Sequence, residues 1–148
     1  MTDHAISAHA LTRMYALPFA RNTASCRVLE KTGYVLDFGL IKTITKQIVD
    51  RLDEHTIIPS LSDCLEIRHQ DHEIRVSYEK DFFIFPASDV ALLPIMHSSA
   101  EELARFIWRE VSAELERRQA LNDVIAMEVS VAEGPGQAAV YRQQFSPK

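Results

Sequence analysis

The strongest periodic pattern in the chain lies between Ser99 and Leu115, where apolar residues recur every three or four positions. This spacing places them on one face of a helix, with charged residues opposite. The apolar stripe consists of Ala100, Leu103, Ala104, Ile107, Trp108, Val111 and Leu115. Ser99 and Glu102 have the spacing of a capping box, so we expect the helix to begin there. Phe106 lies off the stripe, which favours an exposed side chain or a subunit contact.

After this helix the apolar period changes to two, which is typical of a strand with one buried face. Met127, Val129 and Val131 share that face. The same alternation places Glu133 on the apolar face at the end of the strand, where a carboxylate needs hydrogen-bond donors. The Gly134-Pro135-Gly136 sequence then predicts a turn.

The middle of the chain predicts a second helix and several strands. Asp37 is placed to cap a helix whose apolar residues are Leu40, Ile41, Ile44, Ile48 and Leu52. Residues 59–63 are expected to form a loop. Residues 65–69 and 74–78 each alternate, which predicts a hairpin around Gln70 and Asp71. An apolar run at 82–85 stops at Pro86, and Pro94 makes the run at 89–96 an edge or irregular strand.

The first 36 residues follow a different pattern. Residues 11–16 are compatible with a short strand that Pro18 ends. The segment from Asn22 to Gly33 predicts a helix, because Asn22 is a favourable cap and Gly33 a favourable stop.

Composition favours one globular domain with a substantial core. The chain has 148 residues, of which 47% are hydrophobic and 25% charged. Its net charge of −5 gives no electrostatic reason to expect binding to nucleic acid or to an anionic membrane. No apolar run is long enough to span a bilayer. Two cysteines, Cys26 and Cys64, do not form a disulfide framework, so we expect a cytoplasmic protein.

Residues 35–143 resemble the 6-pyruvoyl-tetrahydropterin synthase family, which includes the 6-carboxytetrahydropterin synthases of queuosine biosynthesis. The resemblance is carried by Ser98-Ser99-Ala100-Glu101-Glu102-Leu103-Ala104, the Trp108 helix, and Val129-x-Val131-x-Glu133 with Pro135, Ala139 and Tyr141. Asp37-Phe38-Gly39-Leu40-Ile41-Lys42 and Leu52-Asp53-Glu54-His55 match two further family elements.

The resemblance implies an α+β fold of the tunnelling (T-fold) type, an antiparallel sheet with two helices on one face. Such subunits assemble into homo-oligomeric rings, and the pterin site lies between subunits. The implied activity is that of a lyase acting on a dihydroneopterin triphosphate-type pterin, as in tetrahydrobiopterin synthesis.

The resemblance also implies roles for individual residues. Glu133 matches the glutamate that grips the pterin ring, and Ser98 and Ser99 match threonines that help hold it. A carboxylate can accept two N–H bonds from the edge of a pterin. Asp53 matches the aspartate of the acid–base pair, whereas Glu54 stands where its histidine belongs and His55 comes one position later. A structural alternative remains open, in which the serines only cap the helix and Glu133 only closes a turn.

Zinc is the cofactor that the resemblance implies, held by three histidines that include a His-x-His pair. This chain contains no such pair, so no metal ligand is identified. Its histidines are His4, His9, His55, His69, His72 and His97. His69 and His72 bracket the predicted hairpin turn and fit an ordinary surface position. Cys26 is a candidate for the catalytic thiol, and Cys64 for a small buried residue of a strand.

Residues 22–34 also resemble the tail of GNAT-type N-acetyltransferases, in the string Asn-x-Ala-Ser-x-Arg-Val-Leu-Glu-Lys-x-Gly-Tyr. We therefore divide the chain into an acetyltransferase-tail-like segment at 1–36 and a synthase-like domain at 37–148. The main hypothesis is a pterin-binding synthase homologue, catalytically impaired by its missing histidines. The alternatives are a non-catalytic T-fold paralogue or structural subunit, and an acetyltransferase remnant.

Overall fold

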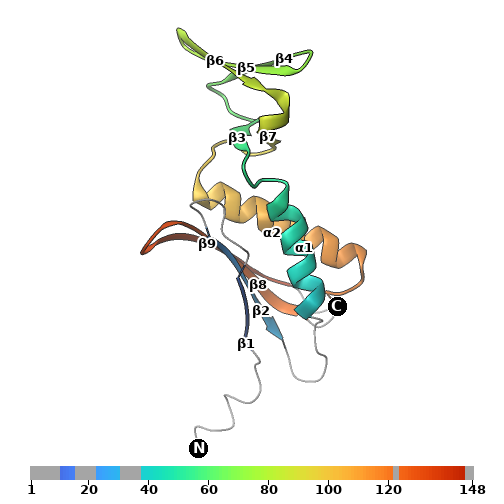
Figure 1. Ribbon diagram of the computed structural model, residues 1–148. Helices are drawn as coiled ribbons and strands as arrows, with labels where there is room; N and C mark the ends of the chain where they lie inside the picture. Colours follow the sequence, from blue (N-terminus) through green and yellow to red (C-terminus); the bar gives the residue numbers. More distant parts are fainter. Residues whose placement is uncertain (1–10, 16–22, 31–37, 122–123, 146–148) are drawn as a thin grey trace, which may run out of the picture.

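The computed structural model describes residues 11–15, 23–30, 38–121 and 124–145. Its largest sheet has four strands in the order β1-β2-β8-β9, each antiparallel to its neighbour. These strands span Leu11–Tyr15, Thr23–Glu30, Val124–Gly134 and Gln137–Gln144. Two helices, α1 (Phe38–Asp50) and α2 (Ala100–Arg117), cover one face of the sheet (Figure 1). The predicted fold class, an antiparallel sheet with two helices on one face, is confirmed.

The main core lies between this sheet and the two helices. The predicted stripe of α2 is buried throughout, and Met127, Val129 and Val131 of β8 face it. From α1 the core receives Ile41, Ile44 and Ile48. Phe106 is buried as well, so the expectation of an exposed or subunit-contacting side chain is wrong for this residue. In the part of the chain that is described, neither helix is long and apolar enough to cross a membrane.

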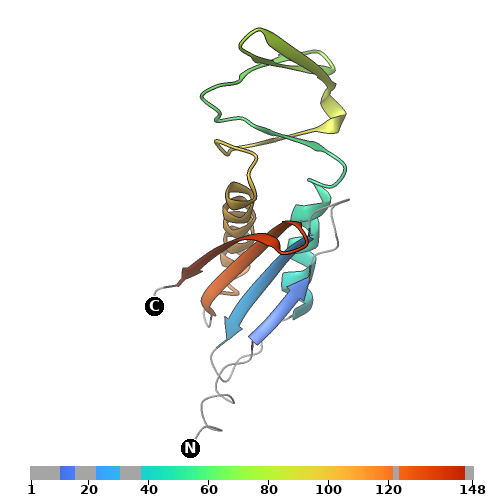
Figure 2. The ribbon, with the colours of Figure 1, turned by 90° about the vertical axis from the view of Figure 1, so that its left-hand side faces the viewer.

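Between the two helices the chain forms an extension that stands away from the main sheet (Figure 2). Strands β3 (Thr56–Pro59) and β7 (Val90–Leu93) pair in parallel at its base. Beyond them β4 (Glu66–Gln70), β5 (Glu73–Tyr78) and β6 (Asp81–Pro86) form an antiparallel sheet. A short 3-10 turn, Ala87–Asp89, leads from β6 into β7. A second small core of Ile58, Ile74 and Val76 packs this sheet against the two-stranded ribbon formed by β3 and β7.

The predicted hairpin around Gln70 and Asp71 is confirmed as β4 and β5. β7 is an edge strand of a two-stranded sheet, as predicted, and it ends at Leu93, just before Pro94. The predicted helix over residues 22–33 is wrong, because residues 23–30 form strand β2. β2 pairs with β1 on one side and with β8 on the other, and Cys26 lies opposite Val129. Pairing with a distant strand therefore overrides the local cap and stop signals. Asp37, the predicted cap of α1, lies outside the described residues.

Candidate functional site

The two candidate serines lie where the extension leads back into α2. Ser99 is the N-cap of α2, and its hydroxyl accepts a hydrogen bond of 3.4 Å from the backbone N–H of Glu102. The predicted cap is therefore confirmed. Ser98 precedes the cap and is exposed. The exposed hydroxyl of Ser98 thus lies just before the backbone N–H groups of the first turn of α2, which favour anionic or carbonyl oxygens.

Glu133 lies near the end of β8, at an irregularity in the pairing with β9. Ala132 is opposite Ala138, but Gly134 is opposite Gln137, so Glu133 is an extra residue in a β-bulge. The side chain is exposed, and the expectation of a core-facing carboxylate is wrong for the single chain. The alternation argument assumed an unbroken ladder, and here the bulge interrupts it. Among the described residues, no hydrogen bond or ion pair engages this carboxylate.

Asp53 and His55 lie in the turn that follows α1, and both are partly buried. Glu54 between them has a positive φ of 58°, so the turn reverses at that residue. The Nδ1–H of His55 donates a 2.6 Å hydrogen bond to the backbone carbonyl of Asp53, because a carbonyl can only accept. The imidazole is therefore held by the backbone of Asp53 rather than by its carboxylate. This bond leaves Nε2 as the nitrogen that can accept a proton.

The candidate residues form two groups within one chain. His55 directly precedes β3, and Ser98 comes after the end of β7. Because β3 and β7 run in parallel, with Thr56 opposite Val90, these two groups lie at opposite ends of the ribbon. Figures 1 and 2 show the end of α1 and the start of α2 apart. The β8–β9 turn, in contrast, lies at the same end of the main sheet as the start of α2.

A further group near the start of α2 was not identified from the sequence. The guanidinium of Arg105 lies 5.6 Å from the centre of the Tyr141 ring and 3.1 Å from a carboxylate oxygen of Glu102. It thus lies between Glu102 in the first turn of α2 and Tyr141 of β9. The spacing of Glu102 and Arg105 suits a helix pair, but nothing in the sequence indicated that Tyr141 would lie beneath the cation.

The exposed thiol in the described region belongs to Cys64, which lies in a bend and not in a strand as expected. Its Sγ donates a 3.1 Å hydrogen bond to Oδ1 of Asp63. This bond, together with the negative charge of Asp63, raises the pKa of the Cys64 thiol. The same bond lowers the pKa of Asp63. Cys64 therefore lacks the electropositive surroundings that activate a cysteine. The side chain of Cys26 lies outside what the structure describes.

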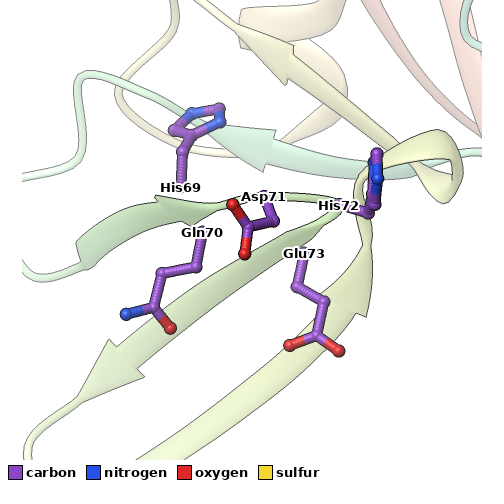
Figure 3. A pocket seen from close by; sticks show the side chains of 5 residues that line it. All are labelled: His69, Gln70, Asp71, His72 and Glu73. Carbon is purple, nitrogen blue, oxygen red and sulfur yellow. The ribbon is translucent and has the colours of Figure 1, made fainter.

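The residues that are described do not form a zinc site. No group of three or more His, Cys, Asp or Glu side chains among them converges closely enough to hold a metal ion. His69 and His72 line a surface pocket at the β4–β5 turn with Gln70, Asp71 and Glu73. Figure 3 shows that the two rings stand on either side of Asp71 and do not converge. His4 and His9 lie outside the described residues.

Comparison with known proteins identifies the family. The family model described as 6-pyruvoyl tetrahydropterin synthase matches residues 19–144. A protein of Methanocaldococcus jannaschii, named "Putative 6-carboxy-5,6,7,8-tetrahydropterin synthase", is 35% identical over 115 residues, which cover 78% of this chain and 70% of that protein.

Solved structures agree with the sequence comparison. A catalytic-residue mutant of Plasmodium vivax 6-pyruvoyltetrahydropterin synthase superposes with a TM-score of 0.82 at 25% identity. The Plasmodium falciparum enzyme has a TM-score of 0.77 at 25% identity. Each comparison covers 93% of this chain and 99% of the other. The architecture is therefore the T-fold, and this chain belongs to the 6-pyruvoyl tetrahydropterin synthase family.

Proposed function

We propose that this protein binds a pterin of the dihydroneopterin triphosphate type, and that Glu133 binds the pterin ring. Family membership across residues 19–144 carries this proposal. The bulge in β8 supports it, because bulges commonly redirect a side chain next to an active site. An exposed carboxylate in this position can accept two N–H bonds from the amino-pyrimidine edge of a pterin.

Ser98 and Ser99 would complete the binding end of the site. Their hydroxyls and the N–H groups of the first turn of α2 suit the carbonyl oxygen of a pterin or a phosphate oxygen. The cap formed by Ser99 already uses one of these groups, so Ser98 is the better candidate for direct contact.

Asp53 and His55 are the proposed acid–base residues. They lie at the far end of the β3–β7 ribbon from Ser98, so a pterin held at Glu133 would meet them only on a neighbouring subunit. We therefore propose a homo-oligomer in which each site combines the Glu133 end of one copy with the His55 end of another. His55 would take a proton at Nε2, since its Nδ1–H is committed to the carbonyl of Asp53.

Triphosphate elimination is the reaction proposed for an active enzyme. The described residues do not fit the zinc ion of the family, so no step here is assigned to a metal. The lack of a His-x-His pair in the sequence favours a second candidate function, a pterin-binding paralogue without catalysis.

Calorimetric titration of the full chain with neopterin tests the binding proposal. We expect saturable binding by the wild type and a loss of at least tenfold in affinity for Glu133→Gln, which keeps the size of the side chain but loses its charge. Glu116→Gln, an exposed position on α2, makes the same charge change and should bind like the wild type. Absence of binding by the wild type, or equal binding by Glu133→Gln, would refute the proposal.

A separate assay distinguishes the two candidate functions. Release of triphosphate from dihydroneopterin triphosphate by the wild type would establish the enzyme. Neopterin binding without any triphosphate release would establish the non-catalytic paralogue.

A further inference from the structure

The two outer strands of the β4-β5-β6 sheet differ in how their edges are protected. β4 carries Glu66 and Arg68, which form an exposed ion pair with each other. β6 has no charged residue after Asp81, and its side chains are exposed: Phe82 by 54%, Phe83 by 57% and Ile84 by 50%. Sheets of soluble proteins usually block an open edge with charges, bulges or a covering segment. β6 is thus an apolar edge strand without these protections.

The direction of the backbone groups on β6 follows from its pairing with β5. The N–H of Ala87 donates to the carbonyl of His72 at 2.7 Å, in the same register as the pair of Ile74 and Phe85. In an antiparallel ladder, alternate residues direct their N–H and C=O groups to the same neighbour. Phe83 and Phe85 therefore point theirs toward β5. Phe82 and Ile84 point theirs outward, away from the sheet.

We propose that β6 pairs with β6 of a second copy of this chain, antiparallel and about a two-fold axis. Such an axis is perpendicular to the sheet, so only residues on the same face can lie opposite one another. Placing Phe82 opposite Ile84 of the second copy satisfies this condition and lets the two residues exchange backbone hydrogen bonds in both directions. This register also keeps Pro86, which has no N–H, outside the paired positions.

The side chains of β6 are complementary to themselves in this register. Phe82 gains Ile84 of the second copy as its cross-strand neighbour, an aromatic and β-branched pair of the kind that stabilises sheets. The guanidinium carbon of Arg75 lies 4.1 Å from the centre of the Phe82 ring. Phe83 lies on the axis, stacked on Phe85 at 6.4 Å, and would meet Phe83 of the second copy.

Charged residues lie near the two ends of β6, outside its apolar centre. Lys80 lies just before the strand, and Asp89 lies in the short turn after it. The two-fold axis brings Glu79, Lys80 and Asp81 of each copy to the end where Asp89 of the other copy lies, so these ends are not complementary in charge. Asp81 lies opposite Tyr78, on the other face of β6 from Phe82 and Ile84. The apolar centre of β6 is thus the part that matches a rotated copy of the same strand.

Replacing Ile84 with proline tests the pairing, because it removes a backbone N–H that points outward and forms no hydrogen bond with β5. The matched control is His69→Pro on β4, because its N–H also points away from β5 in the observed register. We would measure the mass of the full chain by sedimentation over a range of concentrations, because a single strand pair is small compared with a stable interface. We expect Ile84→Pro to halve the largest mass that the wild type reaches, and His69→Pro to leave it unchanged. Equal masses for the wild type and Ile84→Pro, or a monomeric wild type throughout, would overturn the proposal.

Cross-linking at the axis gives a second test that does not depend on a proline. With Cys26 and Cys64 replaced by serine, Phe83→Cys should form a disulfide-linked dimer under mild oxidation, because opposed residues on such an axis have close Cα atoms. Leu61→Cys, which is also exposed, should not. No linkage at Phe83→Cys, or equal linkage at Leu61→Cys, would contradict the proposed register. Both tests are independent of pterin binding.

Discussion

The indole Nε1 of Trp108 donates a 2.9 Å hydrogen bond to the backbone carbonyl of Met127. Both residues are buried, so this bond fixes α2 against β8, an inner strand of the main sheet. The ring of Trp108 also contacts Tyr141 edge-on at 5.7 Å and stacks on Phe145 at 5.5 Å. One side chain thus joins the helix, β8 and the end of the β9 hairpin.

Trp108→Phe should lower the free energy of unfolding by about 2 kcal/mol or more, because it removes a buried donor and leaves space in the core. Chemical denaturation followed by circular dichroism measures this change.

Tyr141→Phe is the matched control for that variant. It keeps the ring that packs against Trp108, so its effect should stay within about 0.5 kcal/mol. If the two substitutions were equally mild, the hydrogen bond to Met127 would have no part in stability.

Ser99→Ala and Ser98→Ala should separate the cap from the ligand contact. Ser99→Ala removes the N-cap acceptor of α2, and we expect it to lower stability by about 1 kcal/mol. Ser98→Ala should leave the melting temperature unchanged but weaken neopterin binding. Thermal unfolding and titration of both variants provide the comparison, and a fall in stability only for Ser98→Ala would reverse the assignment.

Glu114 should make stability depend on pH in the acid range. Hydrogen bonds from Arg117 and Arg118 lower the pKa of this carboxyl to about 2, against an ordinary value of 4.5. Because the pKa is lower in the folded state, the stabilisation is complete above pH 4.5 and disappears as the pH falls toward 2. Glu114→Gln should therefore flatten the pH dependence of the melting temperature in this window.

Glu116→Gln serves as the control, since Glu116 is exposed and its charge change is the same. Carbonyl-carbon NMR of the wild type reads the Glu114 titration directly. A midpoint near the ordinary glutamate value would show that the two arginines do not hold this carboxylate in solution.

Asp53→Asn and His55→Gln should differ in their effects on catalysis if the protein releases triphosphate. His55→Gln removes the proton acceptor, so we expect kcat to fall at least a hundredfold. Asp53→Asn keeps the backbone carbonyl that holds the imidazole, so we expect a smaller fall. Single-turnover measurements test this order, and an equal loss in both variants would show that the carboxylate of Asp53 also takes part.

Local sequence patterns predicted the parts of the fold that depend on local structure. The apolar stripe from Ala100 to Leu115 correctly predicted the buried face of α2, because the residues at helical spacing are also those that contact the core. The alternation of Met127, Val129 and Val131 gave the buried face of β8 for the same reason.

The parts that failed depend on pairing between distant segments. The cap and stop signals around residues 23–30 indicated a helix, yet β8 imposes a strand. The ribbon of β3 and β7 was missed, because nothing near Thr56 indicates a partner at Val90. The direction of Glu133 depended on a bulge that the hydrophobic pattern does not reveal. Whether Asp53, His55, Ser98 and Glu133 act on a pterin stays a prediction.

The central position of β8 in the main sheet has a consequence for how the chain folds. β8 lies between β2 and β9 and beneath α2, yet it is made only after both helices and the whole extension. Until it is synthesised, β2 lacks one of its two neighbours in the sheet, although most of the chain has already emerged. β2 and β8 are neighbours in the sheet but far apart in the sequence, and closing the long segment between them costs conformational entropy. We therefore expect slow folding that is limited by the docking of β8. During that delay the β1–β2 hairpin would be a natural target for chaperones.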